Sequence, residues 1–139
     1  MLKAYTDVSV IGNNAVGVAI LMSEDTLIDY AIEKLYGVED SFDGELRALL
    51  MAARMVKDNF SEHEDVTVYV DCLAVVKTAN KCLRQRTARY AFRCQSEWQK
   101  LLYYTKNHTF TVKYTESHLL ERTPNAVCDL SSRIICKLD

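Results

Sequence analysis

Four acidic residues occupy positions where their side chains could act together. Asp7 and Asp71 each end an apolar run, Glu45 lies in a helical pattern, and Asp129 lies in another. A single Asp at a strand end is usually a turn former. If two such strands are neighbours, however, the carboxylates lie close together, and burial and repulsion cost free energy unless a cation binds. Oxygen ligands favour Mg²⁺ or Mn²⁺ over zinc and suit phosphoryl transfer.

The elements that must position these acids begin with two apolar segments rich in β formers. They run from Leu2 to Val10 and from Ala15 to Met22, and the turn-forming sequence IGNN joins them. This pattern predicts an antiparallel hairpin. The next stretch, TLIDYAIEKLYG, has apolar residues at both strand and helix spacing, so these residues alone leave its type open.

Downstream, the pattern predicts helices alternating with strands. Apolar residues at three- and four-residue spacing indicate a helix from Ser41 to about Asp58, and VTVYVD alternates as a strand that ends at Asp71. Helical sequence fills Leu73 to Thr105 with a break near a basic segment, and TFTVKY is a strand. A last helix follows RTPN, with its buried stripe at Val127, Leu130, Ile134 and Leu138. The order predicts an α/β domain with helices covering a mixed sheet.

Composition sets limits on the partners and the compartment. The chain has 139 residues and a formal charge of −2, so we expect one domain, residues 1–139, whose nucleic-acid contacts would depend on a local patch or metal ions. No apolar run reaches the ~18 residues of a membrane span and no signal peptide is visible, so we expect a cytoplasmic monomer without a membrane partner. The absence of a C-x-x-C pair predicts reduced thiols at Cys72, Cys82, Cys94, Cys128 and Cys136.

Four motifs in this order resemble those of the type 1 ribonuclease H family across nearly the whole chain. TDVSVIGN supplies the first acid together with Ser9, Gly12 and Asn13, and ELRALLMAA supplies the second. VYVDCLAVV supplies the third, and NAVCDLSS supplies the fourth together with Asn125. Each motif is weak alone, but four in the right order on the right element types make a specific pattern.

The resemblance implies a five-stranded mixed sheet of order 3-2-1-4-5, with the first three strands antiparallel, and it makes TLIDYAIEKLYG the third strand. It also implies an endonuclease that hydrolyses the RNA strand of RNA–DNA hybrids with two Mg²⁺ ions, or Mn²⁺ in their place. By this resemblance Asp7 contacts both ions, Glu45 and Asp71 support the site, and Asp129 holds the ion associated with the attacking water. Ser9, Asn13 and Asn125 would contact the substrate.

Two further features are candidates for function. The family places a histidine in the loop before the last helix, which matches His118 and suggests a proton shuttle, although a plain exposed histidine is the alternative. The acid-free segment KCLRQRTARYAFR carries Arg86, Arg89 and Arg93 at helical spacing. We expect these arginines to contact nucleic acid, and a solvated helix face is the alternative.

The sequence departs from the family pattern at two places. Val8 stands where the family has glycine, and the segment before Glu45 carries Glu39, Asp40 and Asp43, which would repel a phosphate backbone. These acids favour the alternative functions, a binding module with weak or no cleavage or a DNA-directed nuclease of the same superfamily. The intact set of four acids favours catalysis.

Overall fold

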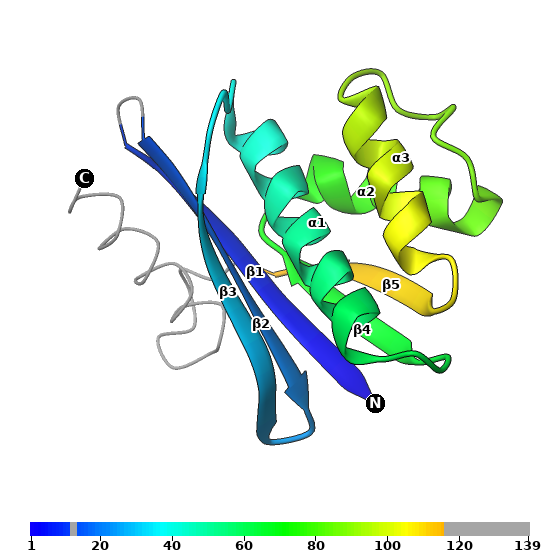
Figure 1. Cartoon of the computed structure of the whole chain (residues 1–139). Helices are drawn as coiled ribbons and strands as arrows, with labels where there is room; N and C mark the ends of the chain where they lie inside the picture. The colour runs from blue at the N-terminus through cyan, green and yellow to red at the C-terminus, as the bar shows by residue number, and fades with distance from the viewer. Residues whose placement is uncertain (12–13, 116–139) are drawn as a thin grey trace.

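The computed structural model describes residues 1–11 and 14–115, which form five strands and three helices (Figure 1). The helix predicted after RTPN lies outside the described residues. The elements are β1 (Leu2–Ile11), β2 (Asn14–Ser23), β3 (Thr26–Leu35), α1 (Ser41–Asn59), β4 (Asp65–Val70), α2 (Leu73–Gln85), α3 (Gln95–Thr105) and β5 (Thr109–Tyr114).

The strands form one sheet in the order β3-β2-β1-β4-β5. β1 pairs antiparallel with β2 and β2 with β3, while β4 runs parallel to both β1 and β5. This arrangement confirms the predicted order. It also resolves the open stretch, because residues 26–35 pair along β2 as a strand, with one irregularity opposite Leu21 and Met22.

One apolar core joins the sheet to all three helices. Helix α1 crosses β1 and β2, and α2 and α3 lie toward the β4–β5 side (Figure 1). Trp98 of α3 and Leu46 and Leu49 of α1 are fully buried in this core. None of the described helices is long and apolar enough to cross a membrane.

The basic segment interrupts the predicted helical stretch. Helix α2 ends at Arg86, whose φ of 53° is left-handed, and α3 begins after Cys94, whose φ is 59°. The predicted break near the basic segment is confirmed, and the alternative of one solvated helix face for Arg86, Arg89 and Arg93 is wrong, because Arg86 is the C-cap of α2 and the other two lie in the loop before α3. Left-handed residues cannot continue an α-helix.

The start of α1 is fixed by a side-chain cap. Asp40 has extended backbone angles, and its carboxylate accepts a hydrogen bond from the Asp43 N–H at 3.0 Å. Such a cap satisfies one of the backbone donors that the first helical turn leaves open. Asp40 thereby sets the position of the helix that carries Glu45.

Replacing Asp40 by alanine should lower the free energy of unfolding by about 1 kcal/mol, because the first turn of α1 loses its cap. Asp40→Asn should retain most of this stability, since an asparagine side chain caps equally well while losing the charge. Urea unfolding of both variants measures the two effects. Equal losses in both would show that charge, and not capping, is what matters at this position.

Candidate active site

The parallel pairing of β1 with β4 brings two of the predicted acids to the same end of the sheet. The pairing runs from Leu2 with Val66 to Tyr5 with Tyr69. Asp7 follows Tyr5 by two residues, and Asp71 follows Tyr69 by two. The register thus places both acids just beyond the β1–β4 pairing, with Asp71 at the carboxyl end of β4, the edge where open α/β sheets bind ligands. The expectation that Asp7 ends a strand is wrong, because β1 continues to Ile11 by pairing with β2.

Glu45 brings a third carboxylate from the first turns of α1. Its side chain is 5% exposed and that of Asp7 is 2% exposed. Burial raises the pKa of Glu45 well above its usual value, and the negative charges of Asp7 and then Asp71 raise it further. Asp7, Glu45 and Asp71 therefore form one electrostatically coupled group, which is named the acid cluster below.

Cys72 also lies near the acid cluster. Its thiol raises the pKa of Glu45 after the two aspartates, and it occupies the N-cap position of α2 without a side-chain capping bond. No role at the site was predicted for Cys72, although it directly follows Asp71. Within the described part of the chain Cys72, Cys82 and Cys94 are free thiols, as predicted.

The chemistry of the acid cluster fits a hard divalent cation. The Oε2 atom of Glu45 is buried and accepts no hydrogen bond from any described residue. A buried carboxylate oxygen in this state is costly unless a cation or a proton compensates it. Among the described residues, however, no three carboxylate, cysteine or histidine side chains are arranged to hold a metal ion. The cluster provides suitable donor atoms but not a complete coordination sphere.

Glycine at position 44 allows α1 to approach β1 at the acid cluster. A Cβ on Gly44 would lie 3.1 Å from Cγ1 and 3.2 Å from Cγ2 of Val8. These distances are shorter than ordinary van der Waals contact. Val8, which replaces the family glycine, is therefore accommodated by a glycine on the facing helix. The role of Gly44 opposite Val8 could not be predicted from the sequence, because the two residues are 36 positions apart and only the fold brings them together.

Several predicted site residues lie outside the described residues. They are Asn13, His118, Asn125 and Asp129. Their roles stay predictions, as does that of Ser9, which is buried on β1 two residues beyond Asp7.

The three predicted arginines differ in how firmly they are held. Arg86 donates hydrogen bonds to the Thr105 hydroxyl at 3.1 Å and the Leu102 carbonyl at 2.8 Å. Arg93 donates to Asp40 at 2.6 Å and to Glu39 at 3.3 Å. No described residue forms an ion pair with Arg89, which is exposed and lies over the ring of Tyr90. Arg89 is therefore the arginine most available to a ligand.

The acidic segment before Glu45 is largely neutralised within the protein. Arg93 pairs with Glu39 and Asp40, and its guanidinium lowers the pKa of the Asp40 carboxyl. Asp43 is buried and pairs with Arg47 at 3.0 Å, and Arg47 also donates to the carbonyls of Tyr36 and Gly37. The segment therefore presents less negative charge to a phosphate backbone than its sequence suggested.

Comparisons with known proteins agree with this fold. The family model described as RNase H matches residues 1–135. No curated protein sequence matches the chain. Several solved structures share the fold at low sequence identity.

One is the prototype foamy virus protease-reverse transcriptase, with a TM-score of 0.71 and 17% identity over 96% of this chain; the match spans only 20% of that chain. RNase H1 from the archaeon Halobacterium salinarum has a TM-score of 0.63 and 19% identity, covering 93% of this chain and 92% of its own. LC11-RNase H1 in complex with an RNA/DNA hybrid has a TM-score of 0.63 and 14% identity, covering 94% of this chain and 92% of its own. These likenesses show the fold.

The raised pKa of Glu45 predicts how the stability of the metal-free protein depends on pH. A pKa that is higher in the folded chain contributes stability that is complete below the ordinary value of 4.5 and is lost as the pH rises through the raised value. In EDTA, Glu45→Gln should therefore raise the free energy of unfolding at about pH 8 by roughly 1–3 kcal/mol, because it removes a buried uncompensated charge. Urea unfolding across this pH range measures the effect.

The matched control is Glu62→Gln, which removes the same charge from an exposed loop residue and should leave the pH dependence unchanged. A Glu45→Gln protein no more stable than the unsubstituted chain at about pH 8 would contradict the electrostatic coupling.

The contact between Gly44 and Val8 predicts non-additive effects on stability. In a helix interior Gly→Ala normally adds about 1 kcal/mol. Gly44→Ala should gain less, or lose stability, because its Cβ meets the Val8 methyl groups. In a Val8→Ala background the same change should recover the normal gain, which gives a coupling of about 0.5–2 kcal/mol in a double-mutant cycle measured by urea unfolding. Strictly additive effects would show that the two residues do not limit the approach of α1.

Proposed function

The chain belongs to the ribonuclease H family, and from this premise we propose that it is a metal-dependent endonuclease that hydrolyses the RNA strand of RNA–DNA hybrids. The observation that carries the proposal is the acid cluster, in which Asp7, Glu45 and Asp71 come from three separate elements to one end of the sheet. A family member without catalysis would have no evident need to bury carboxylates that repel one another.

The proposed cofactor is Mg²⁺, with Mn²⁺ as an alternative. Asp7, Glu45 and Asp71 would hold it together with Asp129. When bound, two such ions would supply charge stabilisation for in-line attack of water on a phosphodiester. Asp7 and Asp71 would contribute fixed oxygen donors, since one lies on β1 and the other directly follows β4. Because the pKa of Glu45 is raised, cation binding should be coupled to release of a proton from this side chain.

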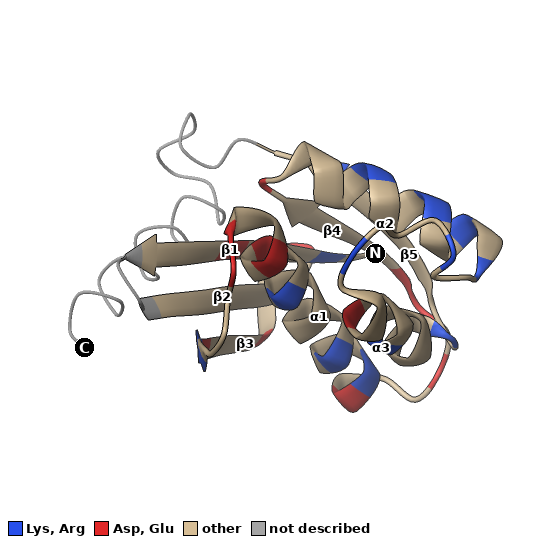
Figure 2. Cartoon of the chain, turned by 90° about the horizontal axis from the view of Figure 1, so that it is seen from above, with Lys and Arg blue, Asp and Glu red and all other residues tan. Residues whose placement is uncertain are grey.

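Substrate contacts are proposed for cations of α2 and the loop that follows it. Lys77, Lys81 and Arg84 are exposed on α2, as Figure 2 shows by the blue bands along this helix, and Arg89 is exposed just beyond it. Together they would supply the local positive surface that an acidic protein needs to bind a polyanion. Arg86 and Arg93 would contribute less to binding, since each is already held by neighbouring side chains or carbonyls.

The alternative function is a nucleic-acid- or protein-binding module with weak or no cleavage, or a DNA-directed nuclease. Its main support was the acidic segment before Glu45. The pairing of this segment with Arg47 and Arg93 reduces the expected repulsion of phosphate. The acid cluster and the reduced repulsion together favour cleavage of nucleic acid over a binding module, and the resemblance to hybrid-cleaving family members favours the hybrid over duplex DNA.

The proposal predicts cleavage of a labelled RNA–DNA hybrid with Mg²⁺ or Mn²⁺ and none in EDTA. Duplex RNA and duplex DNA, assayed in parallel, should be cleaved poorly. Asp71→Asn should lower hybrid cleavage by more than about 100-fold, beyond the usual cost of losing an outer-shell partner of a metal site. Gel-resolved initial rates measure both effects.

Asp65→Asn is the matched control, because Asp65 is an exposed acid at the opposite end of β4 and should leave cleavage unchanged. Preferred cleavage of duplex DNA would support the DNA-directed alternative. Metal-dependent cleavage of no substrate, or equal cleavage by Asp71→Asn, would overturn the proposed activity.

A further inference from the structure

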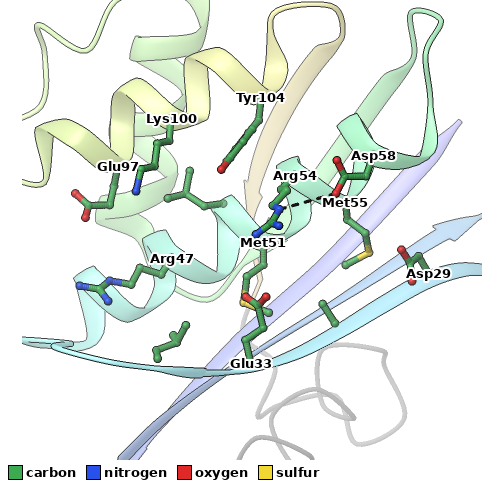
Figure 3. A pocket seen from close by; sticks show the side chains of 13 residues that line it. Asp29, Glu33, Arg47, Met51, Arg54, Met55, Asp58, Glu97, Lys100 and Tyr104 are labelled. Atoms are coloured by element: carbon green, nitrogen blue, oxygen red, sulfur yellow. Dashed lines mark ion pairs between the residues drawn. The ribbon is translucent and has the colours of Figure 1, made fainter.

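A groove on the helical side of the sheet lies between β3 and α3, with α1 as its base (Figure 3). It has a volume of about 470 Å³, and none of the acid-cluster residues lines it. One wall is β3, which contributes Asp29, Ala31, Glu33 and Leu35. This volume is in the range of sites that take one or two side chains or a small ligand.

The floor of the groove is apolar and adaptable. Met51 and Met55 of α1 lie along it (Figure 3), and Leu35 and Leu50 also line the groove. Gly17 of β2 lies beneath, where a Cβ would be 2.8 Å from the Met51 sulfur and 3.2 Å from a methyl carbon of Leu35. The missing side chain thus lets Met51 lie close to the sheet and gives the groove its depth. Methionine side chains adjust readily to the shape of an apolar guest.

The rim of the groove has an excess of uncompensated negative charge. Arg47 forms an ion pair with Asp43, and Arg54 forms one with Asp58 at 3.9 Å. Among the described residues no cation pairs with Glu33, and Asp29 is bonded only to neutral groups, the Asn59 amide at 3.0 Å and the Tyr30 N–H at 2.8 Å.

Across from β3, Lys100 and Glu97 of α3 have opposite charges (Figure 3). The β3 wall therefore favours a guest with positive charges on both sides of an apolar centre.

The outer edge of β3 could form backbone hydrogen bonds with an extended segment that carries such charges. Among the described strands, only β2 pairs with β3, so the backbone donors and acceptors on its other side face outward. The opposite edge of the sheet is different, because Asn80 of α2 donates to the Val112 carbonyl at 2.8 Å and accepts from the Val112 N–H at 3.1 Å. One edge is thus capped by a helix side chain, and the other is available for strand addition.

We propose that β3 and its groove bind an extended segment of a partner protein that adds to the sheet as a sixth strand. In a strand beside β3, every second side chain faces the groove. The residue opposite Ala31 would enter the groove and should be apolar, and the residues opposite Asp29 and Glu33 should be basic. The recognised pattern is therefore basic-x-apolar-x-basic. This surface is separate from the acid cluster and its role does not depend on the proposed nuclease activity.

The test is titration of the ¹⁵N-labelled protein with the peptide Ser-Lys-Thr-Val-Thr-Lys-Ser, acetylated and amidated at its ends. Saturable amide shifts should occur along β3 and in α1 at Met51 and Met55. Glu33→Lys should weaken binding by at least about tenfold, because like charges then face each other across the strands. Its matched control is Asp25→Lys, which makes the same charge change in the exposed turn of the same hairpin and should bind normally.

A second peptide with both lysines replaced by glutamate should fail to bind the unsubstituted protein and should bind the double variant Asp29→Lys/Glu33→Lys better than the basic peptide does. The double variant Glu24→Lys/Asp25→Lys, which makes the same total charge change in the hairpin turn, should still prefer the basic peptide. This exchange of preference distinguishes pairing along β3 from general charge attraction. Absence of saturable shifts in β3, or equal binding of the basic peptide to Glu33→Lys, would overturn the proposal. The amide spectrum of each variant reports that it is folded, and unchanged hybrid cleavage in Glu33→Lys would show that the two surfaces act separately.

Discussion

Mutual repulsion among buried carboxylates is the constraint on which the rest of this structure depends. Asp7, Glu45 and Asp71 would separate or remain exposed if nothing held them, because each raises the free energy of the others' charged forms. The sheet resists this separation by pairing β1 directly with β4, with the acids just beyond the paired residues. Helix α1 adds Glu45 to this group from the layer that covers the sheet. The apolar core beneath these elements must supply the free energy that the acid cluster costs.

The position of α1 depends on small details at its first turn. Asp40 sets where the helix starts, and Gly44 allows it to lie against Val8. Either a longer side chain at 44 or a different start would move Glu45 relative to the strand that carries Asp7. In this chain the glycine that permits close approach is on the helix, because the strand carries Val8 at this contact.

The sequence alone predicts the secondary structure well where local patterns carry the information. The start of α1 at Ser41 and the position of Asp71 directly after β4 agree with prediction, because helical spacing and alternation reflect burial directly. The strand order agrees too, but the family resemblance implied it and local patterns did not. Asp7 was expected at a strand end and lies within β1, because pairing with β2 is not visible in the local pattern. The stretch at 26–35 was ambiguous from its residues, since an edge strand with apolar groups on both faces has no clean period of two. The helical spacing of Arg86, Arg89 and Arg93 favoured one helix face only as an alternative, and the residues that exclude it, the left-handed residues at 86 and 94, are not visible in a pattern of charges. The pairing of Arg93 with Asp40 could not be predicted from the sequence, since the two residues lie more than 50 positions apart.

The contact between Arg93 and Asp40 has a further consequence. It ties the loop between α2 and α3 to the residue that starts α1, and it is exposed enough for dissolved ions to weaken it. Ionic strength would then act on the protein in two ways, through its affinity for the proposed nucleic-acid substrate and through the ion pair that joins this loop to α1. For this chain, the slope of nucleic-acid affinity against salt concentration would therefore include the weakening of the Arg93–Asp40 ion pair as well as the release of counterions. The slope would then overstate the number of phosphates contacted.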